Sequence, residues 1–199
     1  MNGLLKMSFY KILVIEYISE NNELEKVLQN QGFQACTFYS ESLDIKQITN
    51  EIKPQIIIIN SEKVTDTIIE FIQKLNLVYA RPMILFSEDS DTQSVNKVIK
   101  AGISAFIVSG LESKRIKSII DIAAARFKEQ QQLKTELKKT KSKLEERKLV
   151  DRAKGILIKT RSFSEDEAYH TLRKLAMDRN IALGEMAKNV ISMAELLEN

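Results

Sequence analysis

Short apolar runs alternate with amphipathic segments over the first 110 residues of the chain. The runs span 11–16, 33–39, 56–60, 83–87 and 104–108. The first and third are rich in β-branched residues, as strands covered on both faces should be. The intervening segments repeat apolar residues at roughly helical spacing, over 20–31, 44–52, 68–75 and 91–101. This alternation predicts a five-stranded parallel sheet of the flavodoxin-like α/β class.

One long helix is expected after this domain. Between 112 and 160 the chain has no proline and one glycine, Gly155, and good helix formers dominate. A heptad-like stripe of mixed polarity runs through Ile116, Ile119, Ala123, Arg126, Gln130, Leu133, Leu137, Thr140 and Leu144. Its three leucines favour a short coiled coil between two chains. The alternative is a single solvated helix, but no acid between Lys128 and Gly155 has a base four residues later to support it.

The last 55 residues predict an all-α unit of three helices. Ser164 and Glu167 have the spacing of a capping box, and apolar residues follow at helical intervals. The third helix is expected to begin at Leu183 or Gly184. We therefore divide the chain into a sheet domain (1–111), a connecting helix or coiled coil (112–144) and a three-helix domain (145–199). About fifty residues give only marginal stability alone.

The amino-acid composition argues against a membrane span, an internal disulfide and a metal site. No apolar run approaches the length of a membrane span, and no signal-peptide pattern opens the chain. The lone Cys36 and lone His170 leave no internal disulfide and no ordinary metal cluster. We expect a cytoplasmic protein without cofactor, metal or membrane partner. The positive charge is concentrated in residues 128–161, which hold 12 basic and 5 acidic side chains. Such a segment either attracts a polyanion or is a solvated helix.

In a doubly wound sheet, function is found at the carboxyl ends of the strands. Three segments at those ends, PQIIIINS (54–61), RPMILFS (81–87) and AGISAFIVSG (101–110), resemble response-regulator receiver domains. The resemblance implies a phosphorylation site, but the residues that phosphorylation requires are replaced. Glu16 beside Tyr17 is what remains of the acidic pair, Asn60 occupies the acceptor position, and Ser109 occupies the lysine position. Only Ser87 keeps its type, with or without a signalling role. An amide cannot form an acyl phosphate, so we expect neither phosphorylation nor a strong Mg²⁺ site.

The segment DRAKGILIKTRSFSEDEAYHTLRKLAMDRNIALGEMAKNVI (151–191) resembles the ANTAR domain, the output module of AmiR- and NasR-type transcription antiterminators. Its AKG-I-L core, its SEDEA-x-x-x-LR-x-x-A run and its L-x-x-x-A pair carry the resemblance. The front domain is most similar to the NasT-type regulators of nitrate and nitrite assimilation. The resemblance implies binding to tandem stem-loops in a leader mRNA, which prevents the terminator hairpin from forming. RNA polymerase would be affected only indirectly. Some such regulators are held inactive by a ligand-sensing partner protein, so control by a partner instead of phosphorylation is expected.

RNA loops are bound by cations at the phosphates and by planar rings stacked on bases. The candidate RNA-binding residues are Lys148, Arg152, Lys154, Lys159, Tyr169, Arg173, Lys174 and Lys188. Lys154 is favoured because it lies in both the motif and the basic segment. Each has an ordinary alternative: Tyr169 packs at the core edge, and Lys174 pairs with Asp178. Gly155 costs about 1 kcal/mol in a helix relative to alanine, which predicts close approach by another helix or by RNA.

Two other functions compete with RNA-binding antitermination. Three short helices also suit a DNA-binding transcription regulator with a degenerate receiver. The third helix, however, has one lysine and three glutamates, whereas a major-groove helix should be richer in Arg, Lys, Asn or Gln. The other alternative is a protein-interaction scaffold. None of the three is an enzyme, and a homodimer is expected.

Overall fold

The computed structural model describes residues 10–17, 23–39, 44–108 and 113–197. The chain divides into two compact units, residues 1–131 and 132–199. The helix α5 (Ser113–Arg161) belongs to both, with its first part in the first unit and the remainder in the second. The expected boundaries at 111 and 144 remain predictions.

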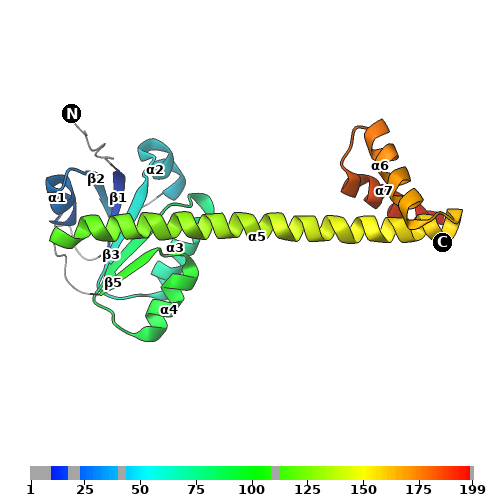
Figure 1. Cartoon of the computed structure of the whole chain (residues 1–199). Coiled ribbons are helices and arrows are strands. Elements are labelled where there is room, and N and C mark those ends of the chain that lie inside the picture. The colour runs from blue at the N-terminus through cyan, green and yellow to red at the C-terminus, as the bar shows by residue number, and fades with distance from the viewer. Residues whose placement is uncertain (1–9, 18–22, 40–43, 109–112, 198–199) are drawn as a thin grey trace, which may run out of the picture. The chain divides into compact units, whose positions relative to one another are not determined.

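The first unit is the predicted five-stranded sheet (Figure 1). All strands pair in parallel, in the order β2-β1-β3-β4-β5. The strands are β1 (Lys11–Glu16), β2 (Gln34–Tyr39), β3 (Ile56–Ser61), β4 (Met83–Ser87) and β5 (Ala105–Val108). The helices between them are α1 (Glu23–Asn30), α2 (Ile45–Ile52), α3 (Asp66–Val78) and α4 (Thr92–Ala101). The predicted α/β class is confirmed; the first residues of the helix expected at 20–31 lie outside the described part.

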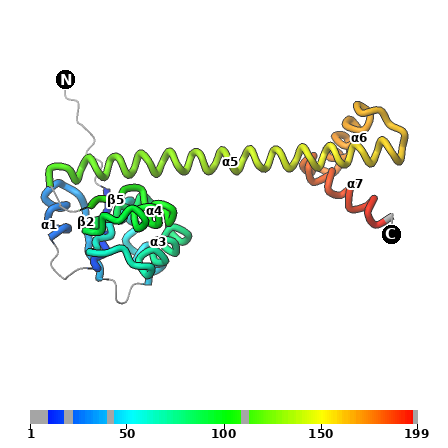
Figure 2. The backbone as a smooth tube through the Cα atoms, turned by 90° about the horizontal axis from the view of Figure 1, so that it is seen from below, coloured from blue at the N-terminus to red at the C-terminus, as the bar shows by residue number. Residues whose placement is uncertain are grey.

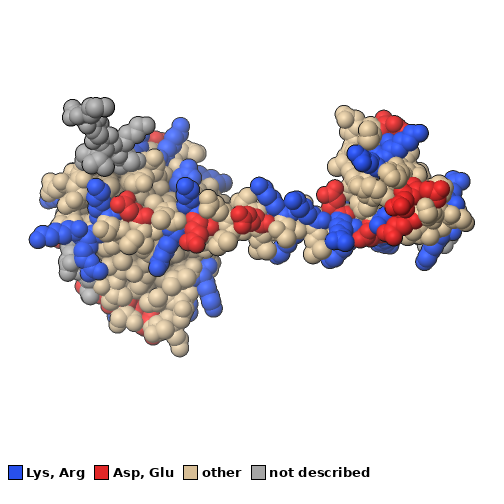
Figure 3. Space-filling model, in the orientation of Figure 1, with Lys and Arg blue, Asp and Glu red and all other residues tan. Residues whose placement is uncertain are grey.

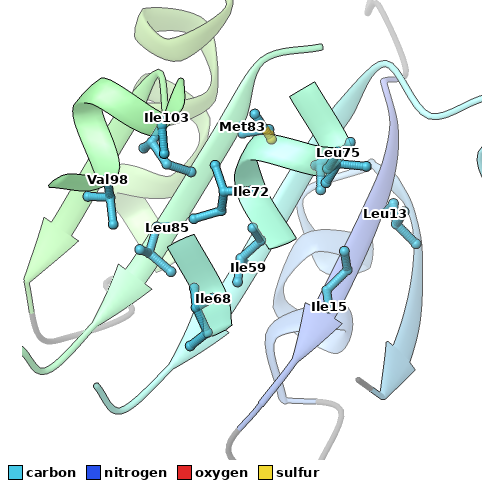
Figure 4. Packing of buried hydrophobic residues seen from close by; sticks show 12 residues of the cluster. Leu13, Ile15, Ile59, Ile68, Ile72, Leu75, Met83, Leu85, Val98 and Ile103 are labelled. Atoms are coloured by element: carbon cyan, nitrogen blue, oxygen red, sulfur yellow. The ribbon is translucent and has the colours of Figure 1, made fainter. Parts of the chain in front are cut away.

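Two apolar cores cover the two faces of this sheet, because side chains of a strand alternate between faces. On one face Ile57 and Ile59 of β3 pack with Ile68, Ile72 and Leu75 of α3 (Figure 4). On the other face the intervening residues of β3 pack against α1 and the beginning of α5. Figure 2 shows α3 and α4 on one side of the sheet and α5 on the other. The four consecutive isoleucines of β3 are therefore all buried, two on each face of the sheet.

The heptad-like stripe of α5 divides into two parts with different surroundings. Ile116 and Ala123 are buried in the core of the first unit, so they stabilise the sheet domain and are not available to a second chain. Leu133, Leu137 and Leu144 are more than half exposed. The short coiled coil expected at these three leucines remains a prediction.

The second unit packs α6 (Glu165–Asp178) and α7 (Leu183–Leu197) against the end of α5. The capping box is confirmed: the Ser164 hydroxyl accepts a hydrogen bond from the Glu167 amide, and the Glu167 carboxylate accepts one from the Ser164 amide. Its small core contains Val150, Ala153, Leu172, Ala176, Met186, Ala187 and Ile191. Among the described residues, no helix is long and apolar enough to span a membrane.

Candidate functional site

Two residues at the carboxyl edge of the sheet, Glu16 and Asn60, stand where a receiver domain has its phosphorylation site, and they are joined by a hydrogen bond. Strand register places Glu16 beside Asn60, and the Asn60 amide donates to Oε2 of Glu16 at 2.9 Å. The Glu16 side chain is buried, and its Oε1 has no hydrogen-bond partner in the described part of the chain. Burial raises the pKa of this carboxyl, and the Asn60 hydrogen bond only partly opposes that shift. This edge therefore holds one carboxyl of raised pKa, that of Glu16, where a receiver domain has a cluster of charged acids.

Ser87 is also committed to local structure. Its hydroxyl donates to the backbone carbonyl of Glu62 at 2.9 Å and accepts from the Asp89 amide at 3.2 Å. These bonds join the loops after β3 and β4, which supports the structural reading of this serine. Ser109 lies outside the described residues. Within the described residues, no group of three or more His, Cys, Asp or Glu side chains is placed to hold a metal ion.

Incubation of the full chain with acetyl phosphate and Mg²⁺ is expected to leave its mass unchanged. Asn60 offers no carboxylate to phosphorylate, and its amide is already bound to Glu16. Intact-mass spectrometry measures the result, with a receiver that retains its acceptor aspartate as the positive control. A phosphate-sized mass gain on this chain would contradict the degenerate-site reading.

Lys154 is held in an ion-pair cluster of the second unit. Its ammonium lies 2.8 Å from Asp151 of the same helix and 2.8 Å from Glu165 in the first turn of α6, and its side chain is only 15% exposed. Hydrogen bonds to these two carboxylates raise the pKa of Lys154. Phosphate would have to compete with both acids. A role in RNA binding remains a prediction for this lysine, and the structure gives it a role in joining α5 to α6.

Tyr169 lies at a cleft between α5 and α6, which we call the Tyr169 cleft. Its volume is about 450 Å³, and its lining residues are Lys143, Glu146, Arg147, Val150, Asp151, Lys154, Tyr169 and Leu183. The Tyr169 ring is 39% exposed and meets His170 edge to face, with 6.1 Å between ring centroids. Lys143 and Arg147 were not among the sequence candidates, although their place in the basic segment was a signal for them. The cleft thus combines an accessible ring with three cations and two acids, and Arg147 lies 3.9 Å from Asp151.

The other candidates are exposed but do not form one group. Lys148 pairs with Glu145 at 3.0 Å and Arg152 pairs with Glu195 at 2.7 Å. At about 100° per residue, Lys148, Arg152 and Lys159 lie on a different side of α5 from Lys154. Arg173 and Lys174 are exposed on α6, and Lys188 is exposed on α7. The candidates therefore occupy at least two surfaces of the second unit.

The two glycines of this unit have opposite surroundings. A β-carbon on Gly155 would meet no atom within 4 Å outside its own helix, so no other helix among the described residues makes the expected close approach. A β-carbon on Gly184 would lie 2.9 Å from Cγ of Glu146. Gly184 therefore allows the first turn of α7 to pack closely on α5, a role that its position near a helix start did not reveal.

Comparison with known proteins identifies the family of the second unit. Residues 138–191 match the family model of the ANTAR domain. The transcriptional regulatory protein PdtaR of Mycobacterium tuberculosis is 24% identical over 169 residues, covering 85% of this chain and 82% of that protein. A nitrate regulatory protein of Klebsiella oxytoca is 35% identical over 80 residues, which are 40% of this chain and 20% of that protein.

The fold of the sheet domain is similar to that of a solved receiver domain. The signal receiver domain of a modulated diguanylate cyclase from Desulfovibrio desulfuricans aligns with a TM-score of 0.50 and 12% identity, over 61% of this chain and 98% of that one. This likeness shows the fold alone. Residues 138–191 of the chain are therefore an ANTAR domain, and the sheet domain has the fold of receiver domains.

Proposed function

We propose that this protein is a transcription antiterminator whose second unit binds stem-loops in a leader mRNA and thereby keeps the terminator hairpin from forming. The ANTAR match and the regulatory names of the relatives support this role. The nitrate regulatory relative favours nitrate or nitrite assimilation as the pathway. RNA polymerase would respond only to the changed RNA.

The observation that carries the proposal is the Tyr169 cleft. An unpaired base can stack on the exposed face of the Tyr169 ring, while Lys143 and Arg147 neutralise the adjacent phosphates. Cations elsewhere on the second unit add sequence-independent attraction. A DNA-reading helix is less well supported, because α7 offers Glu185 and Glu195 beside its one lysine.

Control is proposed to come from a protein partner and from self-association. The hydrogen-bonded Glu16–Asn60 pair leaves no acceptor for a phosphoryl group, so a ligand-sensing partner would have to supply the signal. The three exposed leucines of α5 support a homodimer, because a solvated helix does not need apolar side chains at that spacing.

Replacing Tyr169 with alanine is expected to weaken binding to a two-hairpin leader RNA by about 10-fold, since base–aromatic stacking contributes roughly 1–3 kcal/mol per base. Fluorescence anisotropy with the full chain measures the affinity. Tyr169→Phe keeps the ring and should bind like the wild type.

Scrambled RNA and duplex DNA serve as competitors in the same assay. Salt-sensitive binding to hairpins alone supports the proposal. Equal binding to duplex DNA would favour the DNA-binding alternative, and binding to neither nucleic acid would favour the scaffold. Equal affinities of Tyr169→Ala and wild type would remove the cleft from the RNA interface.

A further inference from the structure

Six cationic side chains of α5 share one face of the helix, which we call the basic ridge: Lys134, Lys138, Lys141, Lys148, Arg152 and Lys159. At about 100° per residue they fall within a sector about 80° wide. All six are exposed. Of the five acids in 128–161, only Glu145 lies in the same sector. The ridge is therefore a line of positive charge with one acid, Glu145, within it, and blue side chains outnumber red ones along this part of α5 in Figure 3.

The first half of the ridge has no ion-pair partner among the residues that the structure describes. Lys148 and Arg152 have the carboxylates of Glu145 and Glu195 as partners. For Lys134, Lys138 and Lys141, the described part of the structure contains no ion pair with an acid. Lysines on a solvated helix are commonly accompanied by acids one turn away. Lys134 and Lys138 have no acid one turn away, and Glu145, one turn after Lys141, pairs with Lys148 instead, so these three lysines favour an external anion.

The ridge and the Tyr169 cleft face away from each other across α5. The cleft is lined from this helix by Lys143, Glu146, Arg147, Val150, Asp151 and Lys154, which at the same helical increment lie mostly opposite the ridge. A hairpin loop seated at Tyr169 therefore leaves the ridge uncovered. At 1.5 Å per residue, the ridge is about 37 Å long from Lys134 to Lys159, enough to follow several phosphates.

We propose that the basic ridge binds the phosphate backbone of a second stretch of RNA, separate from the loop held in the Tyr169 cleft. This inference rests on the proposed function, because it assigns more of the same transcript to a second surface. The ridge has no aromatic side chain along this face, so its contacts are electrostatic and independent of base sequence. It would hold RNA that flanks the recognised hairpin, which brings more of the leader under the control of one chain.

The test compares two double variants of the full chain that remove equal charge from the same helix. Lys134→Gln with Lys141→Gln alters the ridge. Lys128→Gln with Lys139→Gln, at exposed positions more than a quarter turn away from both, is the matched control. Glutamine preserves helix propensity. Affinity is measured against salt concentration for a minimal hairpin and for the same hairpin with a single-stranded extension.

The extension is expected to strengthen wild-type binding about 10-fold at low salt and to steepen the log–log salt slope by about 0.7 for each phosphate contacted. The ridge variant should lose this gain but bind the minimal hairpin like the wild type, while the control variant keeps the gain. Equal losses in both variants, or a wild type indifferent to the extension, would overturn the ridge proposal alone. Failure of the wild type to bind the minimal hairpin would overturn the proposed function itself. Equal stimulation by a single-stranded DNA extension would assign the ridge to any polyanion and overturn its assignment to RNA.

Discussion

Replacing Leu172 with alanine is expected to unfold the second unit while leaving the sheet domain intact. Leu172 is fully buried at the centre of the small three-helix core, in contact with residues of α5 and α7. Truncating a buried leucine costs about 2–5 kcal/mol. A unit of this size has a free energy of unfolding of only a few kcal/mol. The loss is therefore comparable to the whole stability of the unit, and RNA binding should disappear with it.

Hydrogen exchange followed by mass spectrometry localises this effect. Peptides from α6 and α7 should lose protection, and peptides from β1, β3 and β4 should keep it. Met177→Ala, on the same helix but 70% exposed, is the control and should leave exchange unchanged. Unchanged protection of α6 and α7 in Leu172→Ala would show that the unit is far more stable than its core size implies.

Replacing Asn60 with aspartate is expected to destabilise the sheet domain increasingly as the pH rises from about 5 to 8. The change removes the amide that donates to Glu16 and puts a second carboxyl in its place. The pKa of Glu16 is already raised by burial, so the folded state binds its proton more tightly than the unfolded state does. Stability from such a group is greatest at low pH and falls as the pH passes above the unfolded pKa. With two carboxyls sharing one proton, the fall is steeper, and the loss near pH 8 is about 2 kcal/mol or more.

Thermal unfolding of wild type and Asn60→Asp across this pH range provides the measurement. The double variant Glu16→Gln with Asn60→Asp exchanges the amide and the carboxyl, so one of each remains and stability should return close to that of the wild type. If the single variant showed the same pH profile as the wild type, the two side chains would not be coupled. Restoring aspartate at position 60 is thus expected to weaken the fold without restoring a receiver site.

The elements of the fold were predictable because their signals are local. Four successive isoleucines at 56–59 favour a strand buried on both faces, and the Ser164–Glu167 spacing defines a helix start; both predictions are confirmed. The heptad-like stripe did not show what covers each part of it, because Ile116 and Ala123 have helical spacing whether they pack on a sheet or on a second helix. Periodicity identifies a buried face but not the surface that covers it.

The polar contacts were predictable only in part. The sequence placed Glu16 and Asn60 at the same sheet edge, but their hydrogen bond depends on β1 and β3 being neighbours. The ion pair of Lys154 with Glu165 joins two helices across a turn, which no helical spacing reveals. Acid-first pairs three residues apart, such as Glu145 with Lys148, also support α5, whereas the pair of Arg147 with Asp151 at four residues is base-first. Such contacts require the packing of elements to be known.

The open space around Gly155 makes this position suitable for a fluorescent or spin label. A side chain added here has room, since its β-carbon would have no atom of the described residues within 4 Å apart from the adjoining backbone of its own helix, and the helix would gain from the loss of glycine. A cysteine at 155 carrying a fluorophore or spin label would therefore report on incoming RNA or a second protein chain with little disturbance of the free molecule. Quenching or immobilisation of that label on addition of RNA, or on self-association, would show that the added molecule lies close to α5 at position 155.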